Sequence, residues 1–394
     1  MKKKITSIIR HNFTFISLFI VFCGSYFYKI GSFPFPNTIL NKNNTLVSYS
    51  YLSNIWHNGY FLLYKVFLYL IKSIQVQFSP IILKIPSISF AFLILTLSYY
   101  IVKKWHGNFI AIISSLLLIS WPLLLHLGRY ESYLIIYLLI IPCLFYVRIL
   151  TSTVIKNSRL YLALFVFSLI ILIPGGIWFV VLSLYFNRKN LLTLLKKDIN
   201  TLKVLFSLIL GLFWVPFIVR HIADKFNNIY YFLGANGFQI HSLKYYSTYI
   251  DPFKKVFLSG LSNQSMWLPG TPILSGFMII FFILGLIFFV KNFDANRSKL
   301  ILSLLILSYL LTFFNSEMVL AMSTVMFFIA ISGLHSFLLL WTKQFPVNKI
   351  AKFVAYSLIS LLIFSAVFYN YRSYFVAWKY NQNTIQLFDL HRIN

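Results

Sequence analysis

Apolar runs recur along the whole chain and are separated by short polar segments. Most hold about 16 to 20 or more residues, roughly what a helix needs to cross a hydrocarbon core about 30 Å thick. In a bilayer a helix satisfies all its backbone hydrogen bonds internally. The pattern predicts an all-α polytopic membrane protein with about eleven transmembrane helices. The expected spans are residues 13–28, 82–102, 109–127, a fourth ending at Arg148, two within 160–186, and then 202–219, 273–290, 300–314, 318–341 and 351–369.

One apolar run is interrupted by helix breakers. The run at 160–186 is long for a single crossing and contains Pro174, Gly175 and Gly176 near its middle. Proline removes a backbone donor and clashes with the preceding turn, so it ends or kinks a helix. We expect two short helices that meet at this break near the outer surface.

Basic residues are in large excess and lie in the short segments between apolar runs. The chain has 34 Lys and Arg against 7 Asp and Glu, a net charge of +27. In a soluble protein this excess would suggest nucleic acid. In short loops it fits the positive-inside rule and contact with anionic lipid. We therefore expect membrane lipids and no nucleic acid as partners, a cytoplasmic N-terminus, and a multi-pass location in the inner (cytoplasmic) membrane.

The remaining polar material falls on the outer side of this topology. We expect a transmembrane domain over 1–370, with external loops at 31–78 and 222–272, and an external C-terminal tail at 371–394. Within the first loop, residues 60–78 are apolar but carry Lys65 and Lys72 seven positions apart. Two lysines on one face of an apolar helix indicate a helix that lies in the membrane interface.

A charged junction separates two of the apolar runs. It reads Gly128-Arg129-Tyr130-Glu131, and Glu131 is the first Asp or Glu in the chain. Charged residues at membrane depth need a partner or a wet cavity and so mark candidate functional sites. We expect Gly128 to open a turn that lets Arg129 and Glu131 face one pocket. A hairpin tip whose charges bond lipid headgroups fits the same residues.

Metal and redox chemistry find little support in the sequence. Cys23 and Cys143 both fall inside predicted spans, so they supply neither a disulfide framework nor a Cys-x-x-Cys site. The histidines and acids of the second external loop match no common ligand spacing. No cofactor is predicted, and a divalent metal has no ligand pattern behind it.

Four stretches resemble those of a known membrane family. They are Ser79–Ser87 (SPIILKIPS), Trp56–Tyr64 (WHNGYFLLY), Trp121–Tyr133 with its Trp-Pro and Gly-Arg-Tyr-Glu-Ser-Tyr, and Pro174–Gly176. Their order and spacing over roughly residues 10 to 190 are similar to those of the polyprenyl-phosphate-sugar-dependent glycosyltransferases of the GT-C type. That family includes protein mannosyltransferases and the aminoarabinose transferases of lipid A. The resemblance implies transfer of a sugar from a polyprenyl-phosphate donor to a lipid, glycan or protein at the outer face of the membrane.

Such a transfer needs a base for the acceptor and positive charge for the departing phosphate. We take Glu131 as the first candidate base and His57 as the second. Arginine suits the phosphate because its planar fork pairs two oxygens and keeps its proton. The candidate phosphate ligands are Arg129, Arg220 and Lys84, and the candidate substrate contacts are Trp56, Asn58, Tyr60 and Tyr130.

One departure from the family keeps other functions open. The family carries an Asp or an Asp-Glu pair early in the first external loop, and this loop contains no carboxylate. A lipid-linked saccharide flippase or polymerase is a second interpretation, and it predicts charges in the middle of spans. A non-catalytic GT-C-like protein that binds lipid is a third.

Overall fold

The computed structural model describes residues 2–30, 64–67, 69–70, 80–130, 132–152, 157–195, 219, 228–235, 246–261 and 267–389. Within these ranges every regular element is a helix and no strand occurs. The elements are α1 (Lys2–Phe27), α4 (Pro80–His106), α5 (Asn108–Ser120), α6 (Pro122–Arg129), α7 (Ile135–Ser152), α8 (Asn157–Ile171), α9 (Gly176–Leu195), α12 (Asn228–Phe232), α13 (Tyr246–Lys254), the π-helix η1 (Lys255–Ser259), α14 (Gly276–Lys291), α15 (Asn296–Thr312), α16 (Met318–Gln344), α17 (Lys349–Arg372), the π-helix η2 (Ser373–Trp378) and α18 (Gln382–Asp389).

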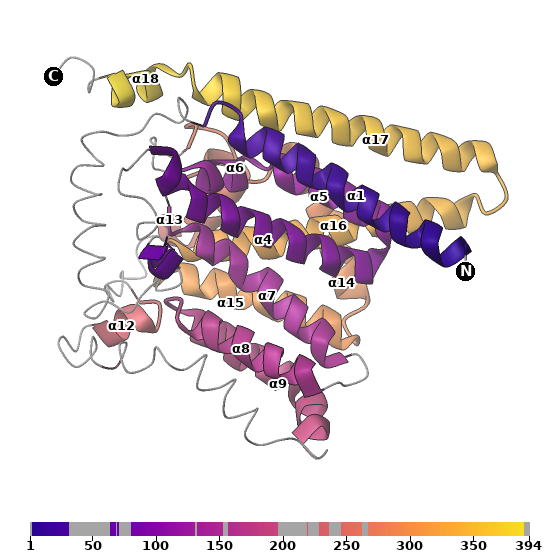
Figure 1. The fold of residues 1–394 in the computed structure, drawn as a ribbon, viewed down its shortest axis with the longest axis horizontal. Coiled ribbons are helices and arrows are strands. Elements are labelled where there is room, and N and C mark those ends of the chain that lie inside the picture. The colour runs from indigo at the N-terminus through magenta and orange to yellow at the C-terminus, as the bar shows by residue number, and fades with distance from the viewer. Residues whose placement is uncertain are drawn as a thin grey trace.

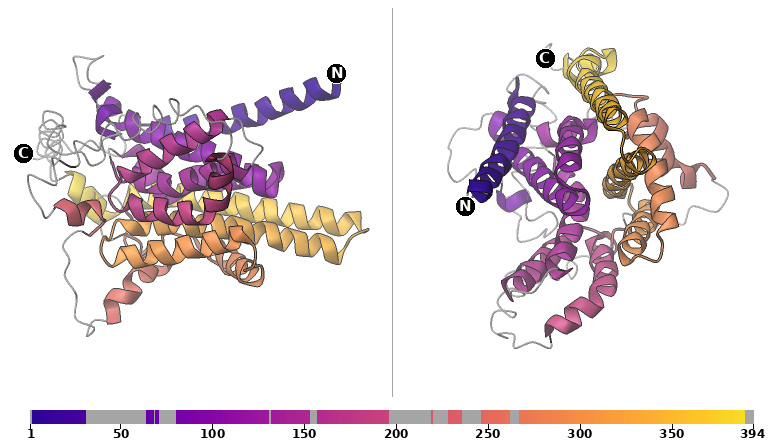
Figure 2. Two further views of the ribbon diagram at one scale, coloured as in Figure 1. Left: turned by 90° about the horizontal axis from the view of Figure 1, so that it is seen from below. Right: turned by 90° about the vertical axis from the view of Figure 1, so that its right-hand side faces the viewer.

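The long helices lie side by side as a bundle (Figure 1). Figure 2, right, looks along the bundle: α1 and α4 to α7 form one side, α14 to α16 the other, and α8 with α9 extends from an edge. Of the most apolar stretch of α16, 94% is buried, against 22% for α17 with η2. Thus α16 is the central helix, and α17 lies on the outside of the bundle.

Three helices are long and apolar enough to cross a membrane: Lys84–His106, Met318–Gln344 and Lys349–Trp378. The pair α5 and α6 adds a fourth if its two bent parts form one span. The predicted count of about eleven is therefore not reached within the described ranges. Four further helices contribute apolar stretches of 10–17 residues: Phe13–Phe27, Ile135–Thr151, Tyr161–Ile171 and Gly276–Lys291.

The two ends of the bundle differ in character. We call one the loop end; it contains residues 25–30, 129–130, 132–135, 171–176 and 312–318, where α1 ends, α7 begins, and α8 and α15 end. The other, the basic end, contains residues 103–108, 291–297 and 343–352. Its basic side chains include Lys103, Lys104, Lys291, Arg297, Lys343, Lys349 and Lys352. The described chain thus alternates between the loop end and the basic end.

The third predicted span, 109–127, is broken rather than continuous. Helix α5 ends at Ser120, α6 begins at Pro122, and the two axes differ by 56°. Trp121 between them has an extended backbone, with φ −59° and ψ 120°. This is the conformation that a following proline favours, and Pro122 itself lacks the N–H that would continue the helix.

The predicted break at Pro174-Gly175-Gly176 is confirmed. Helix α8 ends at Ile171 and α9 begins at Gly176. Gly175 has φ +76°, a backbone conformation that favours glycine. Its N–H donates to the carbonyl oxygen of Phe232 over 2.9 Å, which joins the break to α12. The expected external loop 222–272 therefore carries short helices that pack on the bundle.

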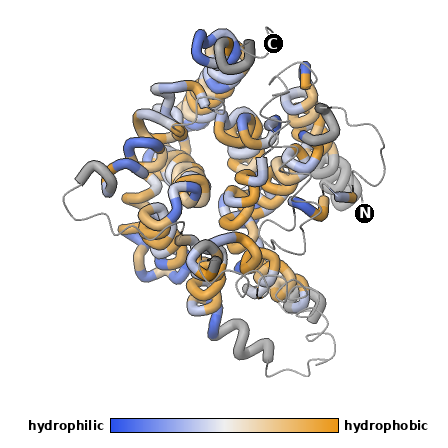
Figure 3. The backbone as a smooth tube through the Cα atoms, turned by 90° about the vertical axis from the view of Figure 1, so that its left-hand side faces the viewer, coloured by the Kyte–Doolittle hydropathy of each residue, from blue (hydrophilic) through white to orange (hydrophobic). Residues whose placement is uncertain are grey.

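Glycines bring α14 and α16 into close contact. A Cβ placed on Gly285 would lie 2.0 Å from the carbonyl oxygen of Ile329, and one on Gly333 would lie 1.9 Å from that of Phe281. Small residues let helix backbones approach closely where lipid supplies no hydrophobic drive between helices. Figure 3 shows apolar positions on outward faces of the bundle as well as in its interior. This distribution fits a membrane-associated protein.

Candidate functional site

Two buried cations meet at the C-terminal end of α1. Arg129, at the end of α6, donates from its guanidinium to the carbonyl oxygens of Ser25 at 3.0 Å and Tyr28 at 2.6 Å. Lys84, on the first turns of α4, donates from Nζ to the carbonyl oxygen of Ile30 at 2.8 Å. The last carbonyls of a helix have no partner within it and carry partial negative charge. The two side chains therefore hold the end of α1 against α4 and α6.

Arg129 is enclosed by the C-terminal segment. Its side chain is fully buried, and its guanidinium carbon lies 5.3 Å from the ring centroid of Tyr374 and 4.7 Å from that of Phe375. Both rings belong to η2, inside the predicted external tail 371–394. Tyr374 and Trp378 are themselves almost fully buried. The tail thus contributes to the loop end of the bundle up to at least Trp378.

His126 lies one helical turn before Arg129 and is surrounded by aromatic rings. Its ring centroid is 5.0 Å from that of Trp267, 4.7 Å from that of Tyr374 and 4.5 Å from that of Trp378. Its Nδ1 is buried without a hydrogen-bond partner. The sequence interpretation missed this residue, whose only local signal is its i,i+3 spacing to Arg129.

Gly128 does not open the predicted turn. It lies inside α6, and the chain leaves the helix only at Tyr130, whose φ is −103° and ψ 150°. A Cβ on Gly128 would lie 2.6 Å from the Tyr26 ring and 3.0 Å from the Ala91 Cβ. The glycine is needed for close packing of α6 against α1 and α4.

Ser87 joins three stretches that the sequence singled out. Its hydroxyl lies 3.0 Å from that of Tyr64, it accepts from the N–H of Ser132 at 3.2 Å, and it lies within 3.4 Å of the Ser132 carbonyl oxygen. Ser87 ends the Ser-Pro to Pro-Ser stretch, Tyr64 belongs to the expected interfacial helix, and Ser132 follows Glu131. Residues 64–67 and 69–70 are helical, as predicted. Ser87 is fully buried at the point where these segments meet.

Several predicted site residues fall outside the described ranges, so their placement is not stated. They are the candidate bases Glu131 and His57, the phosphate ligand Arg220, and the substrate contacts Trp56, Asn58 and Tyr60. Tyr130 is described and partly buried, and its N–H donates to the carbonyl oxygen of His126 at 3.1 Å. Of the predicted phosphate ligands, Arg129 and Lys84 bond to backbone carbonyls, which no prediction anticipated.

A buried carboxylate that the sequence interpretation did not select lies at the same end. Glu317 directly precedes α16 and shares a hydrogen bond with the hydroxyl of Tyr137. Asn315 donates from Nδ2 to that hydroxyl over 3.3 Å, and its Oδ1 accepts from the N–H of Glu317 at 2.9 Å. Burial raises the pKa of Glu317 above its ordinary value of 4.5, whereas the bond to Tyr137 lowers it.

The second carboxylate oxygen of Glu317 is buried and has no hydrogen-bond partner. Met318, the next residue, packs against Gly175 at the confirmed break, because its Cε lies 2.4 Å from where a Gly175 Cβ would be. Sequence signals for this cluster exist: Glu317 is one of only 7 acids and sits between two apolar runs. These are the signals that selected Glu131.

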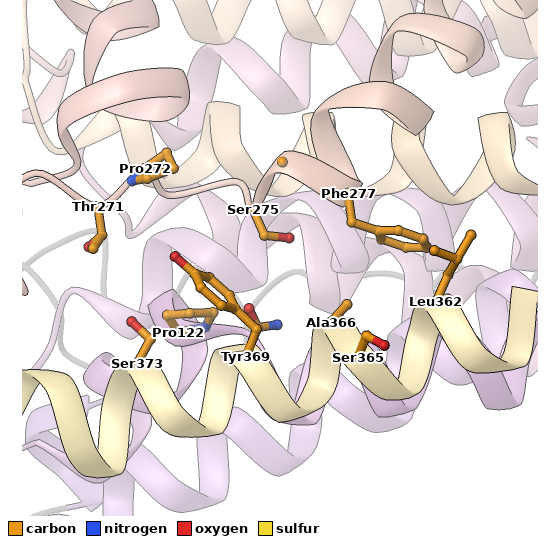
Figure 4. Close-up of a pocket in the computed structure, with 12 residues that line it drawn as sticks. Pro122, Thr271, Pro272, Ser275, Phe277, Leu362, Ser365, Ala366, Tyr369 and Ser373 are labelled. Carbon is orange, nitrogen blue, oxygen red and sulfur yellow. The ribbon is translucent and has the colours of Figure 1, made fainter.

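Two cavities border the bundle. The first, which we call the α17 cavity, has a volume of about 330 Å³ and lies between α17, the start of α6 and the start of α14 (Figure 4). Ser275 Oγ and Asn370 Oδ1 on its wall are buried without hydrogen-bond partners. With further hydroxyls from Thr271, Ser365 and Tyr369, this wall suits an uncharged hydroxylated group.

The second cavity, which we call the apolar cavity, has a volume of about 320 Å³ and lies between α4, α7 and α8. Its lining is almost entirely hydrocarbon, from Leu93, Leu97, Ile136, Leu139, Ile140, Cys143, Tyr146, Leu162, Val166, Leu169, Ile170, Leu172 and Ile173. Arg129 and Lys84 line neither cavity. Within the described ranges no group of three or more His, Cys, Asp or Glu side chains is arranged to hold a metal.

Comparisons of this chain with protein-family models, with curated proteins and with solved structures found no match.

Proposed function

We propose that this protein is an integral membrane glycosyltransferase that transfers a sugar from a polyprenyl-phosphate donor to an acceptor at the outer face of the cytoplasmic membrane. The observation that carries the proposal is the meeting of Ser87, Tyr64 and Ser132 at one buried point. These residues come from three separate stretches that resemble the GT-C family. A chance likeness in sequence gives no reason for the stretches to meet in space.

The apolar cavity supplies a place for the lipid part of the donor. Its hydrocarbon lining suits a segment of an isoprenoid chain, which has no polar group to satisfy. Ile136 and Ile173 line the part of this cavity that is closest to the loop end of the bundle. The next residues in the chain are Tyr137 and Pro174. A chain bound there would place its phosphate near the residues that flank Glu131 and Glu317.

The charge distribution supports the orientation in this proposal. The basic end carries the lysines of three connections, so the positive-inside rule assigns it to the cytoplasm. The loop end then faces outward with the candidate site. We infer that the shorter apolar helices also lie within the bilayer beside the three long spans, as tilted or partial crossings.

In the proposed reaction an acceptor hydroxyl or amine attacks the anomeric carbon of the sugar. The bond from that carbon to the phosphate oxygen breaks, the polyprenyl phosphate leaves with the electron pair, and Glu131 takes the acceptor proton, with His57 as the second candidate base. Arg220 balances the charge of the leaving phosphate. Arg129 and Lys84 act as positioning residues, since their buried bonds fix the end of α1 beside the Glu131 segment.

The test uses the full chain in proteoliposomes with a panel of undecaprenyl-phosphate-linked sugars and a panel of lipid, glycan and peptide acceptors, and it measures release of undecaprenyl phosphate. We expect Glu131→Gln to slow release by about 100-fold or more, the usual range for loss of a general base. Asp251→Asn is the matched control, because Asp251 is a half-exposed acid that pairs with Lys255. Unchanged release by Glu131→Gln would remove the base assignment.

A second function, a non-catalytic protein that binds polyprenyl phosphate, is favoured by one observation. Arg129 and Lys84 are engaged with backbone carbonyls, and the first external loop holds no carboxylate. This function predicts that undecaprenyl phosphate raises the thermal midpoint of the protein while no donor in the panel is consumed. Donor turnover would exclude it.

A further inference from the structure

Four basic side chains from four helices gather near the basic end of the bundle. They are His106 of α4, Arg148 of α7, Arg297 of α15 and His335 of α16. Nη2 of Arg297 lies 3.0 Å from Nε2 of His106. The ring centroids of His106 and His335 are 4.4 Å apart. Arg297 also stacks on Trp105, with 3.9 Å between its guanidinium carbon and the ring centroid. All four basic side chains are partly buried.

Among the described residues no carboxylate forms an ion pair with this basic cluster, and Asp294, three positions before Arg297, is exposed. The ion pair between Asp251 and Lys255 does not involve the cluster. Arg148 bonds instead to the amide oxygen of Asn187 at 3.3 Å. Burial and, to a smaller extent, the charge of Arg148 lower the pKa of Arg297 to about 10. Partly buried cationic side chains that have no carboxylate paired with them are stabilised by an anion.

Hydrogen-bond donors in the cluster also lack acceptors. Nε2 of His106 lies 3.0 Å from Nη2 of Arg297 and 3.0 Å from the hydroxyl oxygen of Ser332, so Nδ1 is the ring nitrogen left for a ligand. That Nδ1 and the Nε of Arg297 are both buried without a hydrogen-bond partner. Arg297 is also in the first turn of α15, whose N-cap residue, Ala295, offers no side-chain cap. The free N–H groups of that turn add donors and positive potential.

We propose that Arg148, Arg297, His106 and His335 form a binding site for a phosphate group, supplied by the headgroup of an anionic phospholipid at the basic end of the bundle. Arginine pairs phosphate oxygens through its planar fork, and basic pockets between membrane helices bind lipid headgroups. The site is at the opposite end of the bundle from the proposed transfer site. It therefore does not depend on the glycosyltransferase proposal.

The experiment places the full-length protein in nanodiscs of phosphatidylcholine with increasing phosphatidylglycerol and measures retained lipid by native mass spectrometry and the thermal midpoint. A parallel arm adds inorganic phosphate, with sodium chloride at equal ionic strength as its control. Arg297→Gln is the test variant. Lys291→Gln is the matched control, because it removes one exposed charge from the same hairpin.

We expect Arg297→Gln to weaken phosphatidylglycerol binding by about tenfold or more, the effect of losing charge-assisted hydrogen bonds, whereas Lys291→Gln changes it by less than about twofold. If Arg297→Gln does not fold, Arg148→Gln takes its place. A thermal midpoint raised by phosphatidylglycerol but not by inorganic phosphate supports a phosphate group supplied by the membrane. A midpoint raised by both supports the same site, accessible also from solution. Equal binding of phosphatidylcholine, or equal weakening by Lys291→Gln, overturns the proposal.

Discussion

The N–H of Ser132 donates a hydrogen bond to Oγ of Ser87 over 3.2 Å. This bond links the residue that follows Glu131 to the first half of α4. The residue on the other side of position 131 is also held, since the N–H of Tyr130 bonds to the carbonyl oxygen of His126 in α6. The start of the segment that leads into α7 therefore depends on the hydroxyl of Ser87.

We predict that Ser87→Ala lowers both stability and turnover. The substitution removes a buried hydroxyl shared by Tyr64 and Ser132, which costs about 1 kcal/mol of folding free energy and releases the Glu131 segment. Thermal midpoints from size-exclusion chromatography and release of undecaprenyl phosphate measure the two effects. Ser98→Ala, a buried serine further along α4, is the control and should leave turnover unchanged. Equal turnover in both variants would contradict a positioning role for Ser87.

Arg129→Lys should destabilise the protein although the charge is kept. A lysine ammonium lacks the planar fork that spans the carbonyl oxygens of Ser25 and Tyr28 and stacks on Phe375. We expect a loss of about 2 kcal/mol, seen as a lower thermal midpoint in detergent. Arg372→Lys, on an exposed side chain nearby, should have almost no effect. A normal midpoint for Arg129→Lys would show that this fork does not hold the end of α1.

Glu317 predicts a pH dependence of stability. Its pKa is raised by burial in the folded protein, so the folded state binds the proton more tightly than the unfolded chain. The contribution to the free energy of unfolding is therefore full below the ordinary pKa of 4.5 and is lost as pH rises through the raised value. Glu317→Gln, which mimics the protonated form, should flatten this part of the profile. A profile with the same slope in the variant would assign the pH dependence to another group.

Gly333→Ala should separate two packed helices. The new Cβ would lie 1.9 Å from the Phe281 carbonyl oxygen, so α14 must move away from the central helix. Overpacking of this kind costs about 1–3 kcal/mol. The control Gly24→Ala places its Cβ in open space on α1 and should be neutral or slightly stabilising. Thermal midpoints that do not differ between the two variants would contradict the close packing.

Local signals predicted part of this fold. The helix break at Pro174 to Gly176 followed from residue chemistry, because a proline is followed there by two glycines, whereas Pro86 and Pro142, which have no adjacent glycine, lie inside continuous helices. The same chemistry acts at Pro122, but no glycine directly follows that proline and no charged residue interrupts the run, so the sequence interpretation placed one straight span. Hydropathy reports the length of a run and not the direction of its axis.

The candidate site was harder to predict because its contacts join distant parts of the chain. Gly128 was expected to open a turn, yet its neighbour in space is Tyr26, about a hundred positions earlier. Glu317 and Tyr137 likewise meet only after the bundle is packed. Residue type identified which stretches matter, whereas the partners of each charge depended on tertiary packing.

The enclosure of Arg129 also bears on the order of assembly in the cell. The rings that cover its guanidinium, Tyr374 and Phe375, lie about 245 positions after Arg129 in the chain, so they are synthesised well after α1 and α6. Until η2 has been made, the guanidinium needs water or an insertion factor beside it. A chain truncated before η2 would keep an open, hydrated seam, which gives quality-control proteases a feature by which to recognise it.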